Sequence, residues 1–173
     1  MSELPPFART TCDCKHCTVG CKTMPGCLIP GDVERILEYV KPADPWEWLV
    51  SHFLASSGAI VAERTPQGIV QFSVPTLVPA QREDGSCVFL DADAHCTIHP
   101  VSPFGCAYHD THLDAEEADR RSRYAVIAQM GEHPDRDAVT YRVFWAGLQE
   151  QGRVTAATAV RRKAFTEMFE RLT

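Results

Sequence analysis

The sequence lacks any long apolar run, and its first residues lack the features of a secretory signal. Hydrophobic residues make up 45% of the 173 positions, but they stand in short, interrupted stretches. A membrane-spanning helix needs about 20 consecutive apolar residues, so we expect no membrane partner. Residues 1–9 contain neither a basic start nor an apolar segment. We therefore expect a cytoplasmic protein whose thiols stay reduced.

Basic side chains are also scarce in the first two-thirds of the chain. Residues 1–112 contain 7 basic and 13 acidic side chains, residues 113–173 contain 10 of each, and the net charge is −6. Nucleic acid requires a clustered basic surface. The run Arg161-Arg162-Lys163 is explained more simply by a solvated helix face. We predict that nucleic acid is not a partner.

Two further absences concern chemistry. The sequence has no glycine-rich phosphate loop, nucleophile elbow or catalytic-triad motif. Whether the protein is an enzyme, and with which catalytic residues, is therefore left open. No cysteine follows residue 106. We place an organisational boundary after His112, between a cysteine-cluster metal-binding unit (1–112) and a helical extension packed on it (113–173).

What the sequence does have is eight cysteines in two groups. The groups are Cys12, Cys14, Cys17, Cys21 and Cys27, and then Cys87, Cys96 and Cys106. Thiolates in so dense a loop repel one another unless a cation or a cluster neutralises them, and cysteine binds metal as thiolate. Buried free cysteines or disulfides are the alternative, but they do not account for five cysteines within sixteen residues. We predict that all eight are metal ligands.

The spacing of the cysteines leaves the metal open. Structural zinc sites use paired cysteines two to four residues apart, and here only Cys14–Cys17 and Cys17–Cys21 fit while sharing one residue. Iron–sulfur clusters take four thiolates from more irregular loops. We favour an iron–sulfur cluster of the 4Fe-4S type and keep Zn2+ as the alternative. Eight cysteines complete two four-thiolate sites, or one site with spare thiols.

The second cysteine group carries a resemblance to a known family. The segments Cys87-Val-Phe-Leu-Asp and Cys96-Thr-Ile-His-Pro-Val-Ser-Pro-Phe-Gly-Cys106 closely resemble the YkgJ-like cysteine-cluster family of zinc- or iron-chelating proteins. Residues 28–36 are similar to that family's first helix after its cysteine loop. The resemblance covers roughly residues 12–110 and implies a metal-chelating domain. It implies no particular activity, because the family is described mainly by its cysteines.

This chain departs from the family pattern at several positions. His99 stands where the family has tyrosine, Ser102 stands where it has arginine, and the first-group cysteines are separated rather than adjacent. His99 is thereby free to coordinate a metal or to donate a hydrogen bond to a bound species.

The segment His109-Asp110-Thr111-His112 follows the last cysteine directly. Its histidines could complete an open metal site, with Asp110 as a base or as a hydrogen-bond partner of a ligand. The alternative, which we favour, is a polar loop in which Asp110 or Thr111 caps the next helix. We keep His99 and His109 as candidate cofactor-binding residues.

Several elements can be predicted from the first 112 residues. Apolar spacing predicts a helix from Asp32 to the prolines at 42 and 45, and a second helix from Pro45 to Ser56-Ser57-Gly58, with Trp46 buried. The runs 59–64 and 68–74 flank Thr65-Pro66-Gln67 and predict a hairpin. Residues 87–90 suggest a short strand, and the first cysteine segment reads as irregular loop.

Three amphipathic helices are predicted after residue 112. The first is capped by Asp114 with Glu117 and ends before Pro134, the second covers about 137–151, and the third starts near Thr155. Their expected core residues are Tyr124, Ile127 and Ala128; Val139, Val143, Phe144 and Leu148; and Val160, Ala164, Phe165, Met168 and Leu172.

Together these features predict an α+β protein, in which a small, loop-rich, metal-stapled unit with short strands packs with C-terminal helices. The function they favour is binding of a metal centre through the cysteines. Two classes remain: redox or modification chemistry on a small molecule or peptide, and a structural-zinc adaptor module for protein–protein interaction.

Overall fold

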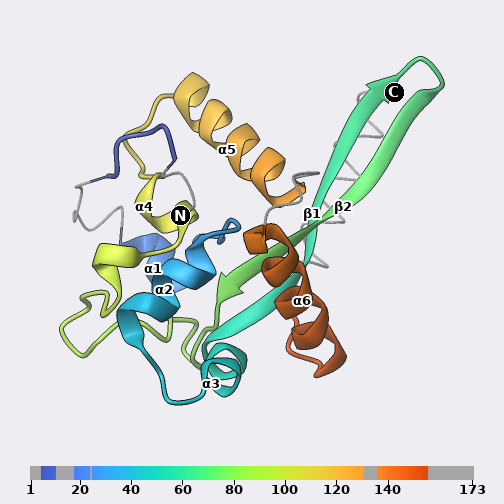
Figure 1. The fold of residues 1–173 in the computed structure, drawn as a ribbon. Helices are drawn as coiled ribbons and strands as arrows, with labels where there is room; N and C mark the ends of the chain where they lie inside the picture. Colours follow the sequence, from blue (N-terminus) through green and yellow to red (C-terminus); the bar gives the residue numbers. More distant parts are fainter. Residues whose placement is uncertain (1–4, 11–17, 24, 131–135, 156–173) are drawn as a thin grey trace.

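The computed structural model describes residues 5–10, 18–23, 25–130 and 136–155 (Figure 1). Its elements are α1 (Val19–Thr23), α2 (Asp32–Val40), α3 (Pro45–His52), β1 (Phe53–Thr65), β2 (Gly68–Pro79), the 3-10 helix η1 (His99–Val101), α4 (Phe104–Ala107), α5 (Ala115–Met130) and α6 (Arg136–Glu150). Helices with a two-stranded antiparallel sheet make an α+β fold, as predicted. No helix among the described residues is long and apolar enough to cross a membrane.

The predicted hairpin is confirmed, but its strands are longer than the sequence indicated. Pairing runs from Phe53 opposite Pro79 to Thr65 opposite Gly68, with a register shift between Ser56 and Ala59. Pro75 lies at this shift and cannot donate a ladder hydrogen bond, which accounts for the bulge. The base of the hairpin lies within the body, and its turn end extends away from the helices (Figure 1).

The two predicted helices before the hairpin are confirmed as α2 and α3. Asp44 caps α3 by accepting the Glu47 N–H at 2.9 Å. The expected end of this helix was wrong, because it stops at His52 and Phe53 already belongs to β1. Residues 53–56 pair with 76–79, and this pairing outweighs the local helical pattern.

Two predictions for the cysteine segments were also wrong. Residues 87–90 form a turn with isolated bridges, Gln81 to Cys87 and Leu90 to Cys96, rather than a strand. Residues 19–23 form the helix α1 instead of irregular loop.

After residue 112, the first two predicted helices are confirmed as α5 and α6. Asp114 accepts the Glu117 N–H at 2.8 Å, so the predicted cap is also confirmed. α5 packs against β2, and α6 packs against both strands. The predicted third helix falls on residues 156–173, outside the described residues. The domain boundary at His112 stays a prediction.

The predicted core faces of the C-terminal helices were partly wrong. Tyr141 and Leu148 are buried, whereas Val139, Val143 and Ile127 are 56%, 62% and 69% exposed. The Tyr141 hydroxyl binds the backbone of Leu28 and Leu77, and this contact fixes the rotation of α6. The main core contains Leu28, Val33, Ile36, Leu49, Phe53, Ala55, Leu77, Cys87, Phe89, Leu90, Ile98, Tyr141 and Leu148.

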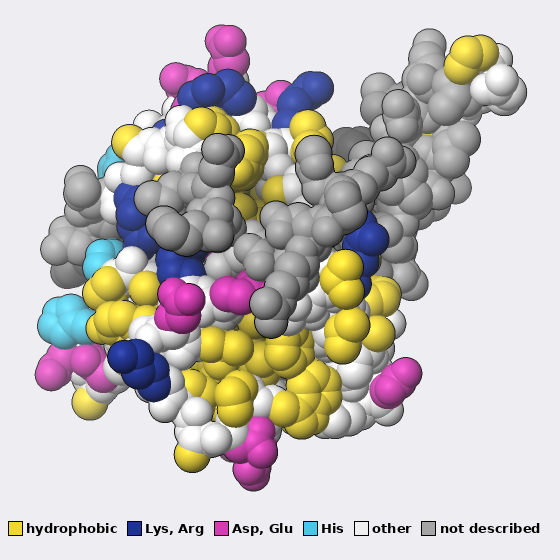
Figure 2. All heavy atoms as spheres, viewed as in Figure 1, with side chains coloured by type: hydrophobic (Ala, Val, Ile, Leu, Met, Phe, Trp, Pro, Cys, Tyr) yellow, Lys and Arg dark blue, Asp and Glu magenta, His cyan; other side chains and the backbone are white. Residues whose placement is uncertain are grey.

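A second, smaller core lies beside the last cysteine. It consists of Ile29, Phe104, Ala107, Tyr108 and Ala125. Trp46, expected to be buried, is 38% exposed and stacks on Phe144. Apolar side chains also gather over the lower part of the body in the view of Figure 2.

Candidate metal centre

The helix α1 brings Cys21 to the second cysteine group. The Cys87 N–H donates to the Cys21 carbonyl at 2.7 Å, so the two residues are joined through their backbones although 66 positions separate them. Gln81 adds a second link by donating its side-chain amide to the Thr23 carbonyl at 2.9 Å. Cys87 is buried, and Cys21 packs against the same core.

The turn that follows Cys87 is organised by Arg82. Its guanidinium donates to the carbonyls of Cys87, Val88 and Leu90 at 3.0, 2.9 and 2.6 Å. Three carbonyls facing one side chain would repel one another without a cation, and a planar guanidinium can serve all of them. The bridge between Leu90 and Cys96 then places Cys96 next to this turn.

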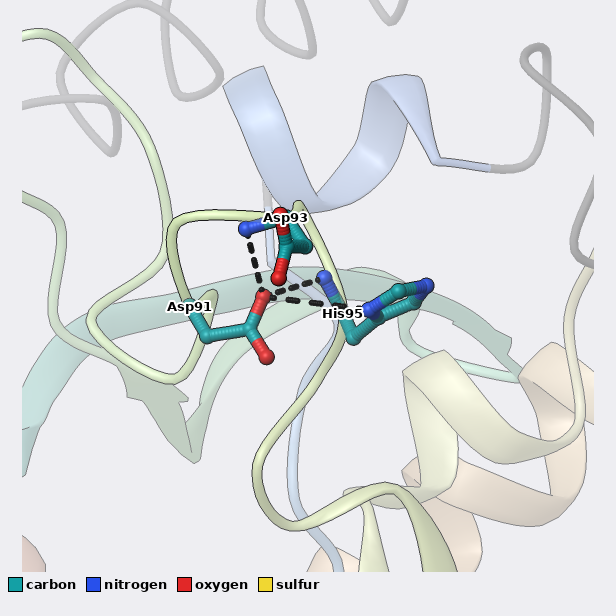
Figure 3. Close-up of side chains that lie close together, drawn as sticks. All are labelled: Asp91, Asp93 and His95. Atoms are coloured by element: carbon teal, nitrogen blue, oxygen red, sulfur yellow. Dashed lines mark hydrogen bonds and ion pairs between the residues drawn. The ribbon is translucent and has the colours of Figure 1, made fainter.

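Asp91 closes the loop between that turn and Cys96. Its Oδ1 accepts the N–H groups of Asp93 at 2.9 Å and His95 at 2.8 Å (Figure 3). Ala94 has a positive φ of 63°, a backbone conformation that this tight turn requires. This exposed loop brings together the carboxylates of Asp91 and Asp93 and the ring of His95. The hydrogen bonds of the turn are sufficient to explain why these groups lie close together.

Cys106 is placed by a close approach of two glycines. The Gly105 N–H donates to the Cys27 carbonyl at 2.8 Å, and the Gly26 N–H donates to Cys106 Sγ at 3.2 Å. A Cβ atom on Gly26 would overlap the backbone of Gly105, and one on Gly105 would overlap the backbone of Gly26 and Cys27. Only glycine therefore fits at both positions.

Asp32 fastens these two segments from behind. Its Oδ2 accepts the N–H groups of Ile29 at 3.0 Å and Phe104 at 2.7 Å, and its Oδ1 accepts Arg35 at 2.6 Å. The carboxyl is fully buried. Burial raises its pKa, while Arg35 and the two backbone N–H groups act in the opposite direction. Asp32 thus ties the loop after Cys27 to the helix that carries Cys106.

Four thiols from three separate segments converge in this way. We call Cys21, Cys87, Cys96 and Cys106 the four-thiol cluster. Burial raises the pKa of all four thiols, that of Cys87 to about 11. The charge of a Cys21 thiolate raises the pKa of the other three further, and Cys87 and Cys96 do the same to Cys106. Mutual repulsion of this kind requires the thiols to be near one another.

The four-thiol cluster is wider than a zinc site. Sulfur atoms on one tetrahedral zinc lie about 3.8 Å apart, given a Zn–S distance of about 2.3 Å. Among the described His, Cys, Asp and Glu residues, only Asp91, Asp93 and His95 form a group of three or more whose ligand atoms all lie within 4.8 Å of one another. No three thiols of the cluster meet this limit. An iron–sulfur cluster places iron and sulfide between its four cysteines, so the thiols present fit that group in number.

The other cysteines of the first group divide into two cases. Cys27 lies half-buried beside Tyr141. Burial raises the pKa of the Tyr141 hydroxyl, and the charge of a Cys27 thiolate would raise it further. Cys12, Cys14 and Cys17 lie outside the described residues. Before them, Thr10 donates its N–H to the Ala107 carbonyl at 2.7 Å and its hydroxyl to Asp110 at 2.5 Å. Both Thr10 and Cys21 are therefore joined to the second cysteine group.

His99 lies on the exposed surface next to the cluster. Its N–H donates to the Cys96 carbonyl at 3.1 Å, and its own carbonyl accepts the Arg9 guanidinium at 2.8 Å. Arg9 also donates to the hydroxyl of Ser102 at 3.1 Å. The imidazole of His99 is exposed and accessible from solvent.

His109 lies between the cluster and α5. Its Nε2 is 3.4 Å from the Ser122 hydroxyl, and its buried Nδ1 has no hydrogen-bond partner among the described residues. Burial lowers its pKa, and the nearby Arg121 acts in the same direction. Asp110 binds Thr10 and the His112 N–H, so it belongs to the polar loop that we favoured. The cap of the following helix is Asp114, however, rather than Asp110 or Thr111.

Sequence reasoning missed the residues that position the thiols. Arg82 and Asp32 make the contacts described above, and neither was expected to do so. One signal was present in the sequence. Glycine precedes cysteine three times, at residues 20–21, 26–27 and 105–106, and glycine beside a ligand permits close approach of the backbone.

Comparison with known proteins adds no further support. No family model, no curated protein and no solved structure matches this chain significantly.

Proposed function

We propose that the protein binds a metal centre through the four-thiol cluster. The observation that carries this function is the convergence of Cys21, Cys87, Cys96 and Cys106 from segments far apart in the chain. Burial raises the pKa values of all four thiols and so disfavours their charged, thiolate forms. A cation that binds as they lose their protons removes both the repulsion and the cost of burial.

The centre that these thiols suit best is an iron–sulfur cluster of the 4Fe-4S type, with Zn2+ as the alternative. Among the described residues, no three thiols lie within 4.8 Å of one another, and this supports the cluster over a single zinc ion. The Gly26 N–H would stabilise the thiolate of Cys106, and the charge of Arg82 favours the thiolate of Cys87. Such a cluster supplies electron transfer or Lewis-acid chemistry when it is bound.

The activity that follows is redox or modification chemistry on a small molecule or peptide. His99 and His109 are the residues we propose for contact with the bound species, His99 because its imidazole is exposed beside Cys96 and His109 because its Nδ1 is unpaired. Cys12, Cys14, Cys17 and Cys27 stay predicted ligands, and with four thiols already assigned to one cluster they would serve a second centre or be spare thiols. The similarity to the YkgJ-like family is part of the same proposal.

A structural-zinc adaptor for protein–protein interaction is the second candidate. One observation favours it: α6 exposes Val139 and Val143 on the side opposite to its core residues Tyr141 and Leu148. An exposed apolar helix face is a feature of docking surfaces.

Single substitutions in protein purified without oxygen test these functions. Cys96→Ser should remove most of the bound metal, because it deletes one of four ligands. Cys27→Ser is the matched control for a single centre and should keep it. Full metal binding by folded Cys96→Ser would contradict the four-thiol cluster, and a partial loss in Cys27→Ser would indicate a second centre. His99→Ala should impair an enzyme and leave an adaptor unchanged.

A further inference from the structure

Arg9 is held beside the second cysteine group without a carboxylate partner. Its Nη2 donates to the His99 carbonyl at 2.8 Å and to the Ser102 hydroxyl at 3.1 Å. Its guanidinium carbon lies 5.8 Å from the centroid of the Tyr108 ring. Arg35 is paired with a carboxylate at 2.6 Å, whereas no ion pair of Arg9 is found among the described residues. The charge of Arg9 is therefore not neutralised by a contact within the described part of the chain.

The contacts of Arg9 fix its guanidinium while leaving its other donors open. Both hydrogen bonds use Nη2, so the N–H groups of Nε and Nη1 have no hydrogen-bond partner in the described ranges of the chain. Neither nitrogen is a buried, unpaired donor, so both are in contact with solvent. A flexible arginine loses rotamer freedom when it binds a ligand, and a side chain already held by two acceptors loses less. Arg9 is thus preorganised to bind an acceptor that comes from solvent.

The groups in contact with Ser102 carry an excess of positive charge. The Ser102 hydroxyl accepts Arg9, and the Ser102 carbonyl accepts Arg35 at 3.3 Å. Asp32 neutralises Arg35 but does not reach Arg9. Two guanidinium groups and one carboxylate leave one positive charge, although residues 1–112 contain 13 acidic and only 7 basic side chains. A single carboxylate from outside the chain would balance this charge.

The position of Arg9 connects this charge to the proposed metal centre. Both of its acceptors, His99 and Ser102, belong to the segment that joins Cys96 to Cys106. The His99 N–H donates to the Cys96 carbonyl at 3.1 Å, so this segment is tied to a thiol of the cluster. The imidazole of His99 is exposed and can donate a hydrogen bond to a ligand. A molecule bound at Arg9 would therefore lie next to the cysteine segments.

We propose that Arg9 binds the carboxylate of the substrate beside the metal centre. This inference rests on the proposed function and names the class of its substrate, a molecule with a free carboxylate, either a small acid or a peptide. The carboxylate accepts charge-assisted hydrogen bonds from the open N–H groups of Arg9, and the His99 imidazole adds a donor. One carboxylate matches the single excess charge, whereas a phosphate dianion exceeds it.

Calorimetric titration of protein purified without oxygen tests the carboxylate site. The probes are N-acetylalanine and its C-terminal amide, which differ only at the carboxylate. We expect the acid to bind at least about tenfold more tightly, because the amide cannot form the charge-assisted hydrogen bond. Arg9→Gln should remove this preference, and Arg123→Gln, at an exposed arginine of α5, should keep it. Equal binding of acid and amide by the wild type, binding of neither, or an unchanged preference in Arg9→Gln would overturn the site.

Chemical labelling of Arg9 is a second measurement that needs no substitution. Phenylglyoxal modifies accessible guanidinium groups, and mass spectrometry of the digested protein locates the modified residues. At about ten times its dissociation constant, N-acetylalanine should slow the modification of Arg9 about tenfold. The amide should not slow it, and neither probe should protect Arg123. Labelling of Arg9 at equal rates with the acid and the amide would contradict the proposal.

Further titrations identify the source of the carboxylate. Tighter binding of a short peptide with a free C-terminus than of N-acetylalanine would support a peptide substrate, and equal binding would support a small acid. Tighter binding of inorganic phosphate than of the acid would overturn the carboxylate. Metal analysis of the same samples separates this inference from the proposed function. Metal-loaded protein that does not distinguish acid from amide would overturn the Arg9 site alone, and folded protein without metal would contradict the metal centre.

Discussion

At the scale of single residues, glycines decide how closely the cysteine segments approach. Gly105 and Gly20 both precede a cysteine, but only Gly105 touches another backbone. We predict that Gly105→Ala destabilises the fold by about 2 kcal/mol or more and lowers the metal content, because its Cβ would overlap Cys27 and Gly26. Urea unfolding and metal analysis measure the two effects.

Gly20→Ala is the control for that substitution. Nothing lies within 4 Å of a Cβ at this position, and it is inside a helix. It should leave stability unchanged or raise it by up to about 1 kcal/mol. Equal behaviour of the two variants would mean that the glycine contact does not position Cys106.

His109 gives a pH dependence at the same scale. Burial lowers its folded pKa below the unfolded value of about 6.5. As the pH falls below 6.5, the unfolded chain takes up the proton first, so stability falls through the window down to the folded pKa. We predict that His109→Gln removes this part of the pH dependence. Unfolding free energies between pH 5 and 7.5 measure it, and a difference between the two proteins that does not change with pH would refute it.

At the scale of elements, the turn after Cys87 depends on one side chain. Arg82→Lys should lower metal affinity and destabilise the fold by about 1–2 kcal/mol, because an ammonium cannot donate to three carbonyls in the fork geometry of a guanidinium. The adjacent, exposed Glu83 offers a control in Glu83→Gln, which should change neither quantity. Metal titration and urea unfolding are the measurements. If Arg82→Lys binds metal like the wild type, the turn does not need the guanidinium.

The packing of α6 on the hairpin depends on a buried hydroxyl. Tyr141 donates to the Leu28 carbonyl and accepts the Leu77 N–H, both at 2.9 Å. Tyr141→Phe leaves both groups buried without this partner and should cost about 2 kcal/mol. Tyr39 is 49% exposed, so Tyr39→Phe should be neutral. Thermal unfolding of both variants, compared at equal pH, checks the difference, and a neutral Tyr141→Phe would show that water or another group satisfies Leu28 and Leu77.

The elements differ in how well the sequence could predict them. Local signals were sufficient for α2, for the cap of α5 by Asp114 and for the hairpin turn, since each depends on neighbouring residues. The end of α3 could not be predicted, because the strand at Phe53 exists only through pairing with distant residues. The prediction of which face of α6 is buried failed for the same reason, since the contacts of Tyr141 with two other segments set the rotation of this helix.

At the scale of the whole molecule, the fold brings distant cysteines together. The number and density of thiols predict a metal site, and this stays a prediction. The sequence could not predict which thiols meet, because that depends on the Cys21–Cys87 backbone contact, the contact of two glycines and the buried Asp32. The second cysteine group and Cys21 therefore form a unit that the spacing of the first group did not indicate.

The most direct test of the metal centre is an analysis of iron, zinc and acid-labile sulfide, with an absorption spectrum, on wild-type protein purified without oxygen. We predict a brown protein with iron and sulfide near about four per chain, as a 4Fe-4S cluster held by four cysteines requires. Colourless protein with about one or two zinc ions would instead support the adaptor. Well-folded protein that contains neither metal would contradict the central claim that the four-thiol cluster is a metal centre.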